Sequence, residues 1–186
     1  MDSAKSLSYN KKGKGTIISL EQGKIPPQAL DLEEAVLGAM MIDKKGVDDV
    51  IDILHSEAFY KPAHQFIYDA IFKLFENSEP IDLLTVSNQL KKDEKLEAVG
   101  GDFYLINLSQ KVSSAAHIEF HARIIAQKHL QRELINVSGE MLKDAYDDTV
   151  DVFDLLDKAE GELFELSENN MKKNTEKISS ILLEEL

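Results

Sequence analysis

Hydrophobic positions in the second half of the chain repeat at the spacing of an α-helix over two long stretches. Their members are Leu134, Val137, Met141 and Ala145, then Val152, Leu156, Ala159, Leu163 and Leu166. The polar residues 147–151 separate the two stretches, and Asp151 is placed to cap the second helix. Because this connection is short, the pattern predicts an antiparallel helical hairpin over residues 117–167, packed through these apolar side chains.

Four further large apolar residues fall outside this packing stripe: Ile135, Leu142, Phe153 and Phe164. Burying such a side chain is worth roughly 1.5–3 kcal/mol, so the four require a second surface. That surface is either the N-terminal part of the same chain or another copy or another protein. Gly139 and Gly161 favour the second alternative, because each costs about 1 kcal/mol inside a helix and lets another backbone approach closely.

The pattern between residues 26 and 114 predicts about six shorter helices. Pro62 suits the first position of one helix, Asp82 is placed to cap another, and Gly100 opens a tight turn before a third. No segment alternates with period two for long enough to form a strand. The predicted fold class is therefore all-α: a compact bundle of about six short helices, then the long antiparallel hairpin and a short linker helix.

These patterns divide the chain into four segments. Residues 1–25 form a Lys-rich arm without periodicity, which we expect to be disordered. Residues 26–114 form the globular helical domain, residues 115–168 the hairpin, and residues 169–186 a polar linker with the start of a linker helix. Because such a short helix is marginal alone in water, we expect it to continue in a longer protein. Its apolar positions include Ile178, Ile181 and Leu182.

The amino-acid composition limits the size of the core and the cellular compartment of the protein. A chain of 186 residues with 43% hydrophobic residues can form one core, or a small domain plus an extension. Cysteine is absent, which excludes disulfides and thiolate metal sites and fits a reducing cytosol. The apolar run at residues 16–20 is too short for a signal peptide or a membrane span. We therefore expect a cytoplasmic protein without membrane contact.

The net charge of −13 is unevenly distributed. From Glu140 onward there are 14 acidic and 5 basic residues, whereas residues 1–25 are basic. An acidic body is a poor ligand for a phosphate backbone. The basic arm could contact nucleic acid, although short arms of this composition more often only solubilise a protein.

No pattern in the sequence is typical of an active site. Residues 13–16 are the only candidate phosphate loop, and they lack the first glycine four residues earlier. His117 and His121 could chelate a divalent ion at helical spacing, but no third ligand has recognisable spacing, and His64 and His129 stand apart from them. We expect no catalytic, cofactor-binding or metal-binding residues.

Five motifs, each weak alone, occur in order from residue 26 onward. They are Pro26-Pro27 with Leu32-Glu33, Val36-Leu37-Gly38 and Met41-Ile42-Asp43; Phe59-Tyr60 with Pro62, His64 and Ile67; Pro80-Ile81-Asp82-Leu83 with Thr85; Val99-Gly100-Gly101 with Tyr104-Leu105 and Leu108; and Ala122, Ile124 and Arg132-Glu133-Leu134-Ile135. Together they resemble the N-terminal domain of the bacterial replicative DNA helicases of the DnaB family. The resemblance covers residues 26–186.

This resemblance implies a hexameric ring whose N-terminal domains form a collar, with hairpins pairing subunits into a trimer of dimers. It implies binding of the C-terminal domain of primase, a response to the helicase loader, and DNA contact only through the ring. ATP and Mg belong to a C-terminal RecA-like motor that this chain does not contain. The chain would be a non-enzymatic collar and interaction domain in the nucleoid-associated replisome of a bacterial cytoplasm.

The resemblance also assigns roles to residues. It makes Ile135, Leu142, Phe153 and Phe164 contacts to another subunit or to primase. It makes the linker helix at residues 177–186 dock on a neighbouring motor domain. His121 stands where the family pattern has Tyr, and Ala126 stands where it has a basic residue. The hairpin surface therefore departs from the family at these two positions.

Two other classes of function compete with this interpretation. One is a small metal-dependent enzyme of helical-bundle type built around His117 and His121. The other is a nucleic-acid binder that acts through residues 1–25, whose binding would be sensitive to salt.

Overall fold

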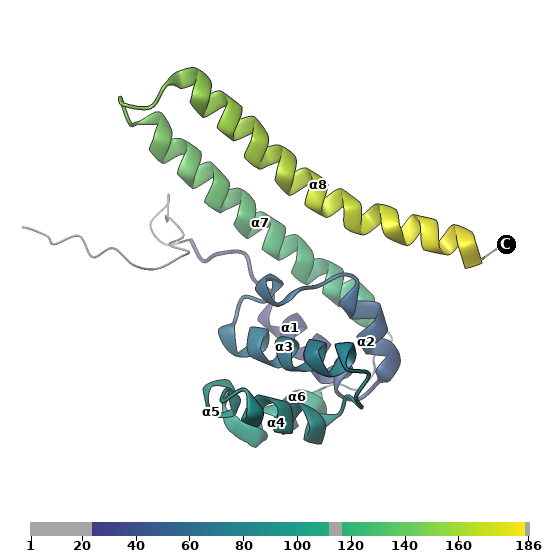
Figure 1. Ribbon diagram of the computed structural model, residues 1–186. Coiled ribbons are helices and arrows are strands. Elements are labelled where there is room, and N and C mark those ends of the chain that lie inside the picture. Colours follow the sequence, from purple (N-terminus) through teal and green to yellow (C-terminus); the bar gives the residue numbers. More distant parts are fainter. Residues whose placement is uncertain (1–23, 112–116, 185–186) are drawn as a thin grey trace, which may run out of the picture.

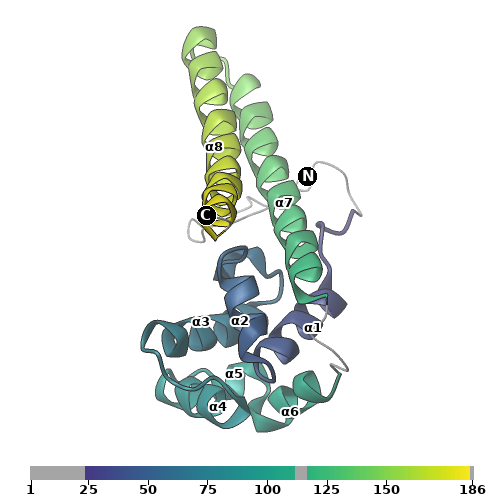
Figure 2. The ribbon, with the colours of Figure 1, turned by 90° about the vertical axis from the view of Figure 1, so that its right-hand side faces the viewer.

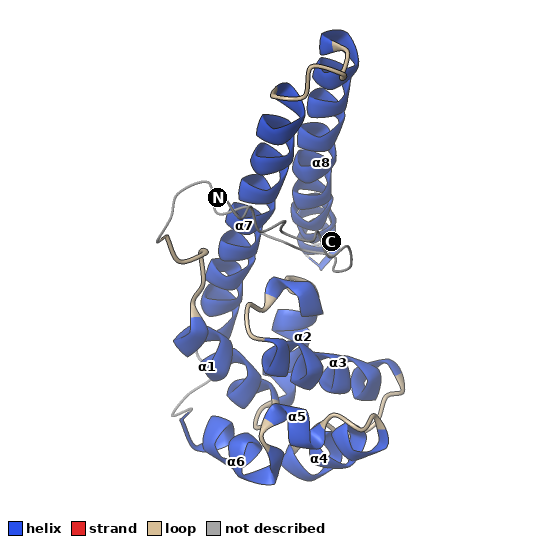
Figure 3. Cartoon of the chain, turned by 90° about the vertical axis from the view of Figure 1, so that its left-hand side faces the viewer, coloured by secondary structure: helices blue, strands red, loops and turns tan. Residues whose placement is uncertain are grey.

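The computed structural model describes residues 24–111 and 117–184, with side chains described through Glu168 except those of Lys44 and Lys45. All regular structure in these residues is helical, and none of it is strand (Figure 3). The predicted all-α class is therefore confirmed. Most of the predicted basic arm lies outside the described residues, as do residues 115 and 116 at the start of the predicted hairpin segment.

The described elements form two regions, a head and a hairpin (Figure 1). The head contains α1 (Leu30–Met40), α2 (Lys44–Ile51), the 3₁₀ turn η1 (Ser56–Ala58), α3 (Pro62–Glu76), α4 (Leu83–Lys92), α5 (Leu96–Val99) and α6 (Gly101–Lys111). The hairpin contains α7 (Ile118–Ala145) and α8 (Val152–Glu184), and the first half of α7 packs on the head.

Local signals in the sequence define several boundaries in the head. Pro62 occupies the first turn of α3. The Asp82 carboxylate accepts hydrogen bonds from the backbone amides of Leu84 and Thr85 at 2.8 and 3.0 Å, and the Thr85 hydroxyl accepts one from the Asp82 amide, which completes a capping box. Gly100 ends α5 with φ of +109°, a left-handed conformation that glycine adopts without strain. The predicted cap and turn are both confirmed.

The hydrophobic core lies around α1 and α3. Both helices are covered on several sides, so the large apolar side chains on their inner faces are removed from water. Helices α4, α6 and the first turns of α7 close the remaining sides. The buried set includes Val36, Leu37, Met40, Ile67, Ile71, Leu90, Leu105, Leu108, Ala122 and Ile125.

The hairpin is a pair of long antiparallel helices that leaves the head and turns back (Figures 1 and 2). At 1.5 Å per residue, α7 is about 42 Å long and α8 about 50 Å. The hairpin prediction is confirmed, but the polar linker expected after residue 168 is helical and belongs to α8. No proline or glycine follows Gly161, and Glu, Lys and Met favour a helix, so polarity alone does not end it. Within the described part of the chain, no helix is long and apolar enough to cross a membrane.

Candidate interaction surface

Burial stops halfway along α7. Ile118, Ala122, Ile125 and Arg132 are buried against the head, but beyond Arg132 the only buried residue in the described part of the chain is Gly139. Helix α8 contains no buried residue among its described side chains. The outer half of α7 and the part of α8 whose side chains are described therefore form an open surface rather than part of a core.

The tip of the hairpin is held by two aspartates. The Asp147 carboxylate accepts hydrogen bonds from the hydroxyl and the amide of Thr149, at 2.7 and 3.0 Å, and these bonds hold its pKa below the ordinary value. Asp151 caps α8 by accepting from the amides of Phe153 and Asp154 at 2.8 and 3.3 Å. The cap predicted at Asp151 is confirmed.

The residues predicted to pack the two helices together divide into two groups. Val137, Met141, Ala159 and Leu166 are partly buried. Leu134, Val152, Leu156 and Leu163 are exposed, so their predicted burial within the hairpin is not found in the single chain. The physical reason is that α8 has one neighbouring helix and cannot cover a wide apolar stripe.

The four residues assigned to a second surface are all exposed in the structure. Their exposed fractions are 37% for Ile135, 41% for Leu142, 73% for Phe153 and 66% for Phe164. No described part of the head covers them, so the described residues give no support to the alternative that they pack on the N-terminal domain. Tyr146, at the end of α7, is exposed as well, and the sequence interpretation did not single it out. We call the exposed large apolar residues of α7 beyond Arg132, of its C-cap and of α8 the hairpin face; they are Leu134, Ile135, Leu142, Tyr146, Val152, Phe153, Leu156, Leu163 and Phe164.

Charges surround this face. The Lys158 ammonium donates to Asp144 Oδ2 at 2.6 Å, which joins α8 to α7 and raises the pKa of Lys158. Further acidic side chains on α8 point to solvent. They are Asp154, Asp157, Glu160, Glu165 and Glu168. The same helices thus expose both apolar and acidic side chains, and the acidic ones disfavour an electrostatic fit to a phosphate backbone.

The three residues expected to dock the linker helix, Ile178, Ile181 and Leu182, lie in the last turns of α8. Their backbone is helical, but their side chains are outside those the structure describes. The docking role assigned to them stays a prediction.

Arg132 fixes the hairpin to the head. Its guanidinium donates to the carbonyl oxygens of Ala58 and Pro27 at 2.7 and 2.8 Å, and it lies 5.7 Å from the centre of the Tyr60 ring. Arg132 is only 7% exposed, and this burial lowers its pKa. A single side chain of α7 thereby holds the segment before α1 and the end of η1. Arg132 belongs to one of the motifs in the sequence, but the motif does not predict these two hydrogen bonds.

A buried polar network holds the inside of the head. Glu33 and His64 are 1% and 0% exposed, with 2.7 Å between Glu33 Oε2 and His64 Nδ1. The other ring nitrogen of His64 lies 2.7 Å from the Tyr104 hydroxyl, and the Lys61 ammonium donates to that hydroxyl at 2.8 Å. The Glu33 carboxylate also accepts from the Tyr60 amide at 2.8 Å. Each buried group of the network thus has a partner, as a stable interior requires.

This network resembles an acid–base relay but is structural. Because Glu33 and His64 are removed from solvent, neither can meet a substrate. At its outer edge, Glu34 pairs with Lys111 and with the Tyr104 hydroxyl. Burial opposes the ionised form of Glu34, but the Lys111 ammonium outweighs it and holds the pKa of Glu34 below its ordinary value. The network ties α1, α3 and α6 together.

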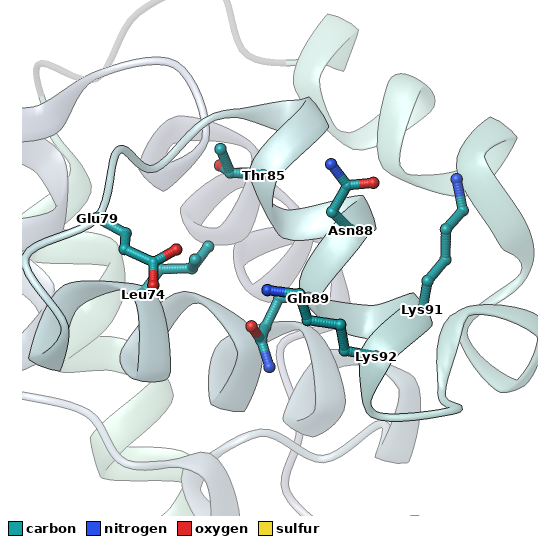
Figure 4. Close-up of a pocket in the computed structure, with 7 residues that line it drawn as sticks. All are labelled: Leu74, Glu79, Thr85, Asn88, Gln89, Lys91 and Lys92. Carbon is teal, nitrogen blue, oxygen red and sulfur yellow. The ribbon is translucent and has the colours of Figure 1, made fainter.

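A pocket of about 350 Å³ lies between α3 and α4 (Figure 4). Thr85, Asn88 and Gln89 line it from α4, and Leu74 and Glu79 lie opposite. Lys91 extends away from Leu74 and Glu79. The lining combines the carboxylate of Glu79 with amides and lysines, and it contains no histidine. Nor do any three His, Asp or Glu side chains in the described ranges converge on a metal position.

Comparison with known proteins identifies a matching family and similar helicases. Residues 25–127 match the family model described as the DnaB-like helicase N terminal domain. The chain is 42% identical over 182 residues to the replicative DNA helicase DnaB of Rhodothermus marinus, across 97% of this chain and 19% of that protein. It is 37% identical over 163 residues to DnaB of Geobacillus stearothermophilus, across 87% of this chain and 36% of that protein.

Two solved structures share the fold. The crystal structure of the N-terminal domain of DnaB helicase from Mycobacterium tuberculosis matches with a TM-score of 0.72 and 36% identity, across 76% of this chain and 99% of that one. A structure of a DnaB-like replicative helicase, described with its interactions with primase, matches with a TM-score of 0.63 and 22% identity, across 74% of this chain and 31% of that one. This second likeness concerns the fold alone.

The chain has a helical head and a projecting hairpin, and it aligns with only a fraction of much longer helicases. It therefore corresponds to the N-terminal domain of a replicative DNA helicase and not to the motor domain. The chain belongs to the DnaB-like helicase N-terminal domain family. It spans about a fifth of the length of the Rhodothermus relative and about a third of the Geobacillus one.

Proposed function

We propose that this domain is the collar of a hexameric helicase ring, in which the hairpin pairs subunits and presents a surface to primase and to the helicase loader. The observation that carries the proposal is the hairpin face, an apolar surface that no described part of the chain covers. ATP and Mg act in the motor domain of the parent protein, and DNA is contacted through the whole ring. The setting is the replisome of a bacterial cytoplasm.

Energetics support pairing through the hairpin face. Moving each large apolar side chain out of water is worth roughly 1.5–3 kcal/mol when burial is complete. Association costs on the order of 4–15 kcal/mol in lost rotational and translational freedom and in ordering. Several side chains of the hairpin face, contributed by both copies, suffice to exceed that cost. A two-fold arrangement uses the same patch on each copy and therefore doubles every contact.

Primase is the first different protein to test. The helicase structure described with its interactions with primase has the same fold, which makes primase a reasonable partner for this domain. Among residues of the hairpin face, Phe153 and Phe164 are exposed enough to anchor a partner, because aromatic side chains dominate binding energy at interfaces. Pairing and primase binding would then use neighbouring parts of one hairpin.

Light scattering across a range of micromolar concentrations tests pairing. We expect a dimer or a hexamer for the unmodified chain and a monomer for Phe153→Asp. Phe103→Asp is the matched control, since Phe103 on the head and Phe153 on the hairpin are both 73% exposed. The control variant should assemble as the unmodified chain does. A strict monomer at high concentration would remove the pairing proposal.

Primase binding needs its own measurement. Calorimetric titration with the C-terminal domain of primase should give saturable binding to the unmodified chain. The double variant Leu142→Asp, Phe164→Asp should lose that binding, and Leu84→Asp, a change at an exposed position of the head, should retain it. Unchanged binding and unchanged self-association in the double variant would contradict the assignment of the interface.

A further inference from the structure

Two histidines that are 74 residues apart in sequence meet where the head joins the hairpin. His55 lies directly before η1, and His129 lies on α7. Their Nε2 atoms are 3.2 Å apart, with ring centroids 4.9 Å apart and an angle of 79° between the ring planes. The buried network and the hairpin face do not use this pair.

The separation of the two nitrogens suits a shared metal ion. Imidazole nitrogen binds Zn²⁺ at about 2.0–2.1 Å with tetrahedral geometry, which places two nitrogen ligands of one ion about 3.4 Å apart. The observed 3.2 Å, over which one ring nitrogen donates a hydrogen bond to the other, is close to that separation, so an ion could take the place of the shared proton. Neutral imidazole also suits Ni²⁺, Cu²⁺ and Co²⁺.

An exposed carboxylate and a route from solvent lie beside the pair. Glu57 Oε2 lies 3.9 Å from His55 Nε2, and the side chains of His55 and Glu57 are 39% and 81% exposed. An exposed carboxylate can turn toward the ion at little cost, and water can occupy the remaining position. Because the carboxylate must first reorient, the three side chains do not form a ready-made group of three ligands.

The backbone that carries the histidines is already held in place. Arg132, one turn beyond His129 on α7, donates to the carbonyl oxygen of Ala58, three residues beyond His55. This bond holds the end of η1 against α7 whether or not an ion is bound. A site whose ligands need no large movement loses little entropy when it binds, so it binds more tightly than a floppy pair.

We infer that His55 and His129, with Glu57 as a third ligand, bind a divalent transition-metal ion that links η1 of the head to α7 of the hairpin. The ion is structural: water, not substrate, completes its coordination, and it reinforces the junction that Arg132 already makes. This site is separate from the His117 and His121 pair, which lies at the start of α7.

Titration of the full chain with Co²⁺, followed by its visible absorption, tests the site directly. We expect saturation at one ion per chain, with the intense bands of a four-coordinate ion. His129→Ala and His55→Ala should weaken binding by about tenfold or more, since even changes outside the ligand set cost that much in metal sites. Glu57→Gln should weaken it less than either histidine variant.

His121→Ala is the matched control, because it removes a histidine of the same helix that takes no part in the pair. Binding to this variant should equal that of the unmodified chain. If His129→Ala bound Co²⁺ as tightly as the unmodified chain, or if His121→Ala lost the binding, the site would be wrongly assigned.

Thermal unfolding with and without Zn²⁺ gives a second readout. A ligand that binds only the folded chain raises its melting temperature. We expect Zn²⁺ to raise it in the unmodified chain and in Phe153→Asp, but not in His129→Gln, with circular dichroism confirming that each variant is folded. Because Phe153→Asp is expected to be monomeric, a rise there separates this site from the proposed pairing of subunits. An equal rise in His129→Gln would overturn the inference.

Discussion

The head and the hairpin are built from the same kind of helix but bury their side chains very differently. In the head, α1 and α3 are covered on several sides, and Leu37, Met40, Ile67 and Ile71 have no exposed surface. In the hairpin, α8 has a single neighbour, and none of its described side chains is buried. The difference shows that helical periodicity determines which residues share a face of a helix. The number of neighbouring helices determines whether that face is buried.

The largest contrast between the two regions should appear when one buried and one exposed side chain are shortened. Ile71→Ala should lower the free energy of unfolding by about 2–5 kcal/mol, because it leaves a cavity in the core. Leu156→Ala, at a position 55% exposed, should cost less than about 1 kcal/mol in the monomer. Urea denaturation at high dilution measures both changes. Equal losses would show that the hairpin is as tightly packed as the head.

A somewhat smaller effect is expected at the junction of the two regions. Arg132→Ala leaves the carbonyl oxygens of Pro27 and Ala58 without their donor, and should cost about 1–3 kcal/mol. Hydrogen exchange should accelerate in the first half of α7 and around η1. Arg132→Lys should not restore stability, since one ammonium cannot reproduce the planar fork. Lys128→Ala, on the partly exposed surface of the same helix, should leave exchange unchanged.

The cap of α4 tests whether local signals in the head matter independently of its core. Asp82→Ala should cost about 1 kcal/mol at neutral pH. Hydrogen bonds from the amides of Thr85 and Leu84 hold the pKa of Asp82 below its ordinary value of 3.8. A depressed pKa means that this contribution is complete above pH 3.8 and is lost as the pH falls through the folded value.

Comparison with a neutral cap isolates that pH dependence. Asp82→Asn keeps an acceptor at the same position but cannot titrate. Below pH 3.8 the stability of the unmodified chain should approach that of Asp82→Asn more closely than at neutral pH. A difference that stayed constant across the whole acid range would contradict the role of the ionised carboxylate.

The smallest effect is expected from the ion pair across the hairpin. Lys158→Ala removes the contact to Asp144, but both side chains are partly exposed and water screens them. Its effect on unfolding should be smaller than that of Asp82→Ala and should vanish at about 1 M salt, where screening acts over about 3 Å. A large effect that resisted salt would show that this part of the hairpin excludes water.

Much of the fold could be predicted because it depends on neighbours in sequence. The hairpin, the caps at Asp82 and Asp151 and the turn at Gly100 all follow from signals within a few residues. The prediction of a linker after residue 168 is wrong, because a polar run without proline or glycine can continue a helix.

The rest depends on contacts between distant segments. His64 and Glu33 are 31 residues apart, and Arg132 reaches Pro27 across 105 residues, so no spacing rule brings either pair together. The same holds for His55 and His129, whereas the sequence directed attention to His117 and His121. The exposed Ile135, Leu142, Phe153 and Phe164 could be found, because surplus apolar positions are visible in the pattern itself.

Because Arg132 attaches α7 to the head, the part of the hairpin beyond Arg132 would move as a lever. From Arg132 to Ala145 the free part of α7 extends about 20 Å. With Arg132 as the fulcrum, a tilt of about 10° would move the tip by about 3 Å, enough to change a packed contact there. A small movement of the backbone beside Ala58 would thus become a larger movement at the far end of the hairpin, where Tyr146 and Phe153 are exposed. A shift of the head near Ala58 would therefore displace the tip of the hairpin.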